Sequence, residues 1–115
     1  MNPSLSLLVL RCRDIETSKS FYENFGMKFI KEKHGKGAEH FAAELNEFVL
    51  ELYPLKQGQE IDPSRLGFSF ENKPGTLDLL KTNNSGLGLE ESNSTTIQDP
   101  DGRKIEITWK NKSAV

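Results

Sequence analysis

The sequence predicts an α+β fold in which two βαβββ modules form a curved mixed sheet. Two observations support this fold. The order strand, helix and three further strands occurs twice along the chain, and each copy ends in an apolar strand that carries one glutamate, Glu51 in the first and Glu106 in the second. We therefore expect a single domain that contains a duplicated module. Module one spans about residues 5–54, a polar linker spans 55–63 and module two spans 64–110.

The first module begins with a Leu- and Val-rich strand over residues 5–13. Asp14 then offers an N-cap to a helix whose apolar face carries Ile15, Phe21, Tyr22 and Phe25. Gly26 is placed to end this helix in a left-handed conformation. Three short strands are expected next, over residues 27–33, 39–45 and 47–54.

The second module opens on a strand over residues 65–71, where apolar and polar residues alternate with a period of two. A short helix is expected after Pro74, with Leu77 and Leu80 on its apolar face. The remaining strands are expected at 87–90, 95–98 and 104–109. Pro100 and Gly102 fit the second and fourth positions of a type I turn between the last two.

Composition excludes several classes of function. The 15 basic and 17 acidic side chains give a net charge of -2, which provides no positive field for nucleic acid. The apolar run Leu7–Leu10 is too short for a membrane span or a signal peptide. The single cysteine, Cys12, cannot close an internal disulfide and is expected in the core, which favours a reducing, cytoplasmic location.

Two segments carry a resemblance to a known family. The first runs from Leu10 to Ser18 and continues to the Phe21-Tyr22 and Gly26-Met27 pairs, and the second runs from Asp99 to Ile107. In this order, they resemble the glyoxalase/bleomycin-resistance/extradiol dioxygenase superfamily, known by its vicinal-oxygen-chelate (VOC) fold. The resemblance covers nearly the whole chain and implies the VOC fold.

The resemblance also implies where a metal would bind. Metal-dependent relatives place one ligand on each of four strands, and Glu51 and Glu106 match the two glutamate positions. The other two positions fall at Leu7 and Arg65, whose side chains have no lone pair for a cation. No cofactor is therefore expected, although two carboxylates alone could form a weak divalent site.

Strand alternation predicts which side chains line a cavity. Leu7, Val9 and Arg11 share one face of the first strand, while Leu8, Leu10 and Cys12 share the other. The expected ligand-binding residues are Leu7, Arg11, Glu51, Tyr53, Arg65 and Glu106. A few charges among apolar and aromatic walls suit a small polar or zwitterionic molecule. We also expect Arg65 within ion-pair reach of Glu51 or Glu106, a contact that could serve only to neutralise these charges.

Glu51, Glu106 and His40 are the candidate acid-base residues if the chain is an enzyme. Of the two histidines, His34 lies beside a predicted turn and His40 begins a strand whose inner face can line the cavity, so His40 is the better candidate. A single histidine on a strand is nevertheless more often a partly exposed surface residue than a ligand.

Three functions remain open. The first is a metal-free protein that binds a small molecule, like bleomycin-resistance proteins. The second is a divergent lyase or isomerase that uses Glu51 and Glu106 with a weak divalent metal or as acid and base. The third is a module that contacts another protein through a sheet face or edge. The resemblance and the long apolar strands predict a homodimer, and neither nucleic acid nor membrane is an expected partner.

Overall fold

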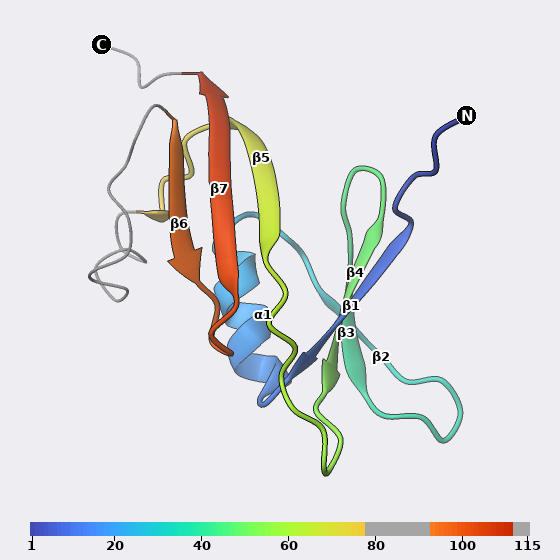
Figure 1. The fold of residues 1–115 in the computed structure, drawn as a ribbon. Helices are drawn as coiled ribbons and strands as arrows, with labels where there is room; N and C mark the ends of the chain where they lie inside the picture. The colour runs from blue at the N-terminus through green and yellow to red at the C-terminus, as the bar shows by residue number, and fades with distance from the viewer. Residues whose placement is uncertain (78–92, 112–115) are drawn as a thin grey trace. The chain divides into compact units, whose positions relative to one another are not determined.

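The computed structural model describes residues 1–77 and 93–111 and divides into two compact units, Met1–Asp62 and Pro63–Val115 (Figure 1). Each unit has its own mixed sheet, and the one α-helix among the described residues belongs to the first unit. The α+β class and the repeated strand order that the sequence predicts are thus observed. No described helix is long and apolar enough to cross a membrane.

The first unit contains a four-stranded sheet with the order β1-β4-β3-β2. Its strands are β1 (Leu7–Cys12), β2 (Ile30–Glu32), β3 (His40–Glu44) and β4 (Val49–Pro54). The β1 and β4 strands pair in parallel, and the other neighbours are antiparallel. The second strand is shorter than the predicted 27–33, because its pairing with β3 begins only at Ile30.

Helix α1 (Ile15–Glu23) begins where the sequence predicts. The carboxylate of Asp14 accepts hydrogen bonds from the backbone N–H groups of Glu16 at 3.0 Å and Thr17 at 3.5 Å, which satisfies donors that have no partner within the helix. Gly26 follows with φ of +87°, the left-handed conformation that glycine adopts most easily.

One face of the first sheet forms the core and the other stays open. Leu10, Cys12, Leu50 and Leu52 are buried on the core side. Leu7, by contrast, lies on the open side with half of its side chain exposed. The predicted alternation along the first strand and the core position of Cys12 are confirmed.

The second unit contains a three-stranded sheet with the order β5-β7-β6. Its strands are β5 (Leu66–Asn72), β6 (Ser94–Gln98) and β7 (Lys104–Asn111). Ile97, Ile105, Ile107 and Trp109 are buried. The predicted strand at 87–90 and most of the predicted second helix lie outside the described residues.

The turn between β6 and β7 contains a buried ion pair that the sequence analysis did not predict. The Arg103 guanidinium lies 3.2 Å from an oxygen of Asp99 and 3.6 Å from an oxygen of Asp101, and all three side chains are buried. The backbone N–H of Gly102 donates to the Asp99 carbonyl at 2.9 Å, and Gly102 has φ of +89°. The expected tight turn is present, with its charged side chains inside the fold.

Candidate functional site

The open face of the first sheet brings together side chains from all four strands. Register places Val9 opposite Glu51 on the β1-β4 pair, and Ala42 opposite Glu51 on the β3-β4 pair. Glu32 lies opposite His40 on the β2-β3 pair. The residues on this face are Leu7, Val9, Arg11, Ile30, Glu32, His40, Ala42, Glu44, Val49, Glu51 and Tyr53.

His40 is the most enclosed of these side chains, with only 1% of its surface exposed. Its Nδ1 lies 3.1 Å from the Ala38 carbonyl, and its Nε2 lies 3.3 Å from both the Tyr53 hydroxyl and Glu32 Oε1. The Glu51 carboxylate is 3.8 Å from the same Nε2. The expectation of a partly exposed surface histidine was therefore wrong, because the cross-strand neighbours of His40 cover its ring.

Aromatic stacking helps to hold His40 in place. The rings of His40 and Tyr53 are stacked, with centroids 4.1 Å apart and planes 10° apart. The Arg11 guanidinium lies over the Tyr53 ring at 4.9 Å and donates a hydrogen bond to the Pro54 carbonyl at 3.2 Å. Arg11, Tyr53 and His40 thus form a cation and two rings in contact on one sheet face.

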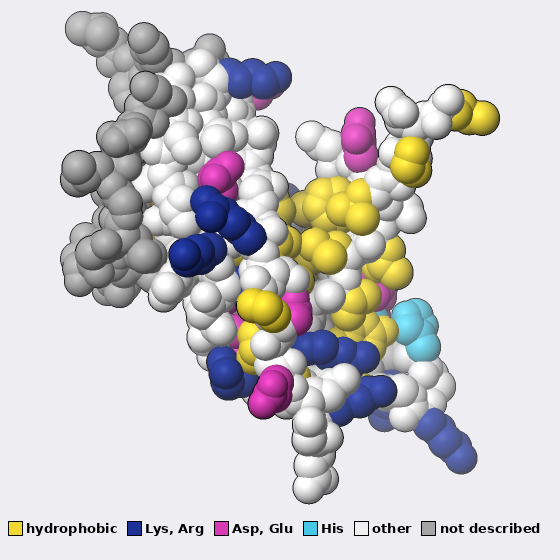
Figure 2. Space-filling model, in the orientation of Figure 1, with side chains coloured by type: hydrophobic (Ala, Val, Ile, Leu, Met, Phe, Trp, Pro, Cys, Tyr) yellow, Lys and Arg dark blue, Asp and Glu magenta, His cyan; other side chains and the backbone are white. Residues whose placement is uncertain are grey.

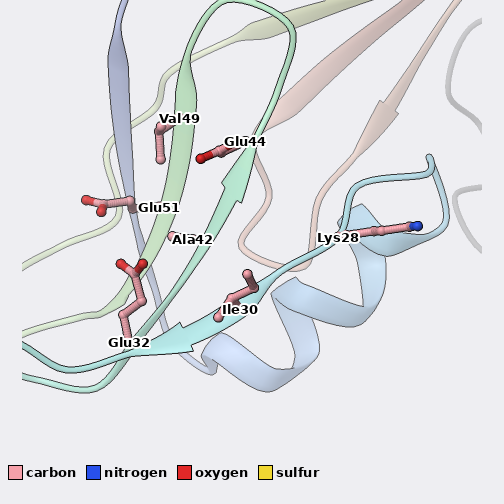
Figure 3. Close-up of a pocket in the computed structure, with 7 residues that line it drawn as sticks. All are labelled: Lys28, Ile30, Glu32, Ala42, Glu44, Val49 and Glu51. Atoms are coloured by element: carbon pink, nitrogen blue, oxygen red, sulfur yellow. The ribbon is translucent and has the colours of Figure 1, made fainter.

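A cavity of about 400 Å³ lies on this face, lined by Lys28, Ile30, Glu32, Ala42, Glu44, Val49 and Glu51. Figure 3 shows the three carboxylates gathered on one side, while the Lys28 side chain points away from them. Three acidic groups against one basic group make this cavity favourable for a positively charged group.

Apolar side chains are also exposed on the first unit. Leu5, Leu7, Val9 and Ile30 are each more than one-third exposed. Figure 2 shows hydrophobic side chains gathered over the strands of this unit, with a histidine beside them. The open face therefore combines apolar surface with the charged cavity.

In the second unit, the expected ion pair of Arg65 is confirmed. Its guanidinium donates a hydrogen bond to Glu106 Oε2 at 3.1 Å. Gly67, two residues after Arg65 in the chain, lies opposite Glu106 in the β5-β7 pair. Their side chains are 57% and 44% exposed, so the pair is not buried in the described structure. On the same face, the hydroxyls of Ser69 and Thr108 lie 3.1 Å apart.

The structure groups the predicted site residues by unit. Leu7, Arg11, His40, Glu51 and Tyr53 share one sheet face of the first unit, and Arg65 and Glu106 form a pair in the second. Sequence reasoning did not find Glu32. The predicted strands at 27–33 and 39–45, joined by a glycine-containing turn, were a signal for that contact, because such a hairpin pairs residues near the inner ends of its two strands.

A comparison with protein-family models identifies the superfamily of this chain. The sequence model of the Glyoxalase/Bleomycin resistance protein/Dioxygenase superfamily matches residues 4–107. This chain belongs to that superfamily. A comparison with curated protein sequences found no significant match.

Solved structures of the VOC fold resemble this chain over almost its full length. A protein from the mobile metagenome of V. Pseudocholerae is 25% identical with a TM-score of 0.61, covering 97% of this chain and 98% of that one. The fosfomycin resistance protein FosX from Listeria monocytogenes, a mutant in complex with Mn(II) and 1S,2S-dihydroxypropylphosphonic acid, is 15% identical with a TM-score of 0.68, covering 96% and 95%. TnmS3, an antibiotic binding protein from Streptomyces, is 18% identical with a TM-score of 0.62, covering 96% and 98%.

Two of the four positions that the resemblance implies for a metal, Leu7 and Arg65, carry side chains that cannot ligate one. Leu7 has no donor atom. Arg65 is positively charged and already forms an ion pair with Glu106, one of the two carboxylates that a metal would need.

Proposed function

We propose that this protein binds a small polar or zwitterionic organic molecule on the open face of the β1-β4-β3-β2 sheet, without a metal at the superfamily's usual positions. The observation that carries this proposal is the cavity on that face, which combines apolar walls with carboxylates and lies beside the stack of Arg11, Tyr53 and His40. The fold is compatible with such a role, since TnmS3 is an antibiotic binding protein.

The chemistry of the cavity favours a ligand with a cationic group. The carboxylates of Glu44 and Glu51 can accept hydrogen bonds from an ammonium group, and Ile30 and Val49 offer apolar contact to the rest of the molecule. Placed charges orient a ligand, whereas apolar walls contribute most of its burial.

A thermal-shift screen of small amines and amino acids with the chelator-treated protein tests this proposal. A ligand that binds the folded state raises the melting temperature in proportion to its affinity and concentration. We expect Glu51→Gln to weaken a hit by about tenfold, the effect of losing one charge-assisted hydrogen bond. The matched Glu106→Gln variant changes a glutamate outside this cavity and should leave the affinity unchanged. Equal loss in both variants would contradict the assignment of the ligand to the first unit.

A second candidate function is acid-base catalysis by a divergent lyase or isomerase. Its support is the position of His40 Nε2, 3.3 Å from the Tyr53 hydroxyl and 3.8 Å from Glu51. Glu51 lines the cavity, and a carboxylate with an imidazole beside it is a pairing used in acid-base catalysis. Incubation of each screening hit with the protein, followed by mass spectrometry, distinguishes the candidates, because a binding protein returns its ligand unchanged.

We further propose that the chain is a cytoplasmic homodimer. Two-fold dimers are the commonest oligomers of soluble proteins. The exposed apolar side chains Leu5, Leu7 and Val9 support a contact with a second copy, and a single buried cysteine is compatible with a reducing compartment. Light scattering at micromolar concentration should give the mass of two chains, and a mass of one chain would refute the dimer.

A further inference from the structure

We propose that Glu32, His34 and His40 form a binding site for a divalent transition-metal cation of the zinc class. These residues differ from those at the superfamily's metal positions, so the inference goes beyond the proposed function. Glu32 Oε1 and one ring nitrogen of each histidine all lie within 4.8 Å of one another. Glu32 Oε1 is 3.3 Å from His40 Nε2 and 3.6 Å from His34 Nε2.

Strand geometry explains why these three side chains meet. Glu32 and His34 are two residues apart, and Glu32 lies opposite His40 in the antiparallel β2-β3 pair. The turn between them contains Gly35 with φ of +58°, a left-handed conformation that lets the chain reverse. The cluster is thus a product of one short hairpin within the first unit.

The hydrogen bonds of His40 prepare it to bind a cation. Its Nδ1 lies 3.1 Å from the Ala38 carbonyl, an acceptor, so Nδ1 carries a proton and donates it there. In the neutral ring, Nε2 then has a lone pair directed to the cluster. A metal-binding histidine uses the same arrangement, with the second ring nitrogen donating to a carbonyl or carboxylate.

The surroundings of Nε2 call for a positive charge. In the neutral form its lone pair would face the oxygens of Glu32 at 3.3 Å and Glu51 at 3.8 Å, with only the Tyr53 hydroxyl able to donate. A cation bound at Nε2 removes this conflict. The ring is 1% exposed and the side chains of Glu51 and Glu32 are 17% and 39% exposed, so solvent screens the Glu51 contact less than the Glu32 contact.

The donor set selects the type of metal. Two imidazole nitrogens and one carboxylate oxygen suit zinc, nickel or cobalt, whereas magnesium and calcium prefer oxygen ligands. Donor atoms around a tetrahedral zinc ion lie about 3.3 Å apart, given bonds of about 2.0–2.1 Å. Glu32 Oε1 already lies 3.3 Å from His40 Nε2 and 3.6 Å from His34 Nε2, and the His34 side chain is 73% exposed and thus has room to rotate. A fourth position remains for water or a ligand, with Glu51 beside it.

Titration of zinc into untagged, chelator-treated full-length protein tests the site by calorimetry. We expect about one ion per chain at micromolar or tighter affinity. Glu32→Gln and His34→Ala each remove a donor from a partly or largely exposed position and should weaken binding at least about tenfold. Circular dichroism should show that both variants remain folded. Glu47→Gln, at an exposed position in the β3-β4 turn, is the matched control and should bind zinc like the unchanged chain.

Nuclear magnetic resonance gives a second readout, because the chain has only 2 histidines. Zinc should shift the ring nitrogen signals of both histidines together, with Nε2 as the bound atom in each. The proposal is overturned if zinc does not bind, if only one histidine responds, or if the Glu32 and His34 variants bind as before. Loss of binding in Glu106→Gln would place the metal at the superfamily's positions instead.

Discussion

The two sheets share the topology of three described strands but carry different chemistry. In each, a strand pairs in parallel with the glutamate-bearing last strand, which also pairs with an antiparallel neighbour: β1-β4-β3 in the first unit and β5-β7-β6 in the second. Glu51 lies opposite Val9, and Glu106 lies opposite Gly67. The two units therefore share this pairing of strands and the position of the glutamate within it.

The neighbours of the two glutamates have diverged. The residue two positions before the cross-strand partner of the glutamate is Leu7 in the first unit and Arg65 in the second. Glu106 consequently has a guanidinium partner, whereas Glu51 lies near a buried imidazole. Because main-chain pairing fixes the scaffold and leaves open-face side chains free to vary, one fold can host different sites.

The largest difference between the two units is expected at their corresponding hairpin turns, β3-β4 and β6-β7, where substitutions should change the free energy of unfolding by very different amounts. The β6-β7 turn buries Arg103 against Asp99 and Asp101, whereas Glu47 in the β3-β4 turn is exposed. Arg103→Met should lower the free energy of unfolding by about 3–5 kcal/mol, because it leaves buried carboxylates without their partner. Glu47→Gln should change it by less than about 0.5 kcal/mol.

Urea unfolding measures both values. Following the transition by far-UV circular dichroism and by fluorescence of the single tryptophan, Trp109, also tests the prediction of one domain, because Trp109 lies in the second unit and α1 in the first. One domain requires coincident transitions for the two signals. A neutral Arg103→Met variant would show that burial of this pair does not distinguish the two turns.

A smaller effect is expected at the Arg65–Glu106 pair. We expect Arg65→Met to lower the melting temperature slightly and Arg65→Met with Glu106→Gln to recover part of that loss. The coupling energy should be about 1 kcal/mol or less, because the side chains are 57% and 44% exposed and solvent screens them. A double-mutant cycle measures it, and a coupling of about 3 kcal/mol would instead indicate a buried pair.

Sequence pattern predicted the parts of the molecule that backbone physics controls. Alternation of apolar and polar residues predicted the core face of β1, and the N-cap preference of Asp14 predicted the start of α1. Pro100 and Gly102 predicted the turn between β6 and β7. Each of these depends on residues close together in the chain.

The site was harder to predict because it depends on contacts across strands. The burial of His40 arises from Tyr53 and Glu32, which are 13 and 8 residues away, and its environment follows from register. Similarly, the sequence predicted an ion pair for Arg65 but not its exposure, which depends on the side chains around it. Composition and periodicity contain no direct measure of either quantity.

The smallest expected effect concerns the pH dependence of the cap of α1, an element of the first unit. A hydrogen bond from the Thr17 hydroxyl, together with the backbone N–H groups of Glu16 and Thr17, lowers the pKa of Asp14 from its ordinary value of 3.8. Since the folded-state pKa is lowered, the cap contributes stability above the unfolded value, and this contribution is lost as the pH falls through the folded value. Asp14→Asn keeps a capping oxygen without this titration. On acidification from neutral pH to below about 4, the urea midpoint followed by circular dichroism should therefore fall less in Asp14→Asn than in the unchanged chain. Equal falls in the two proteins would mean that the charge on Asp14 does not stabilise the helix.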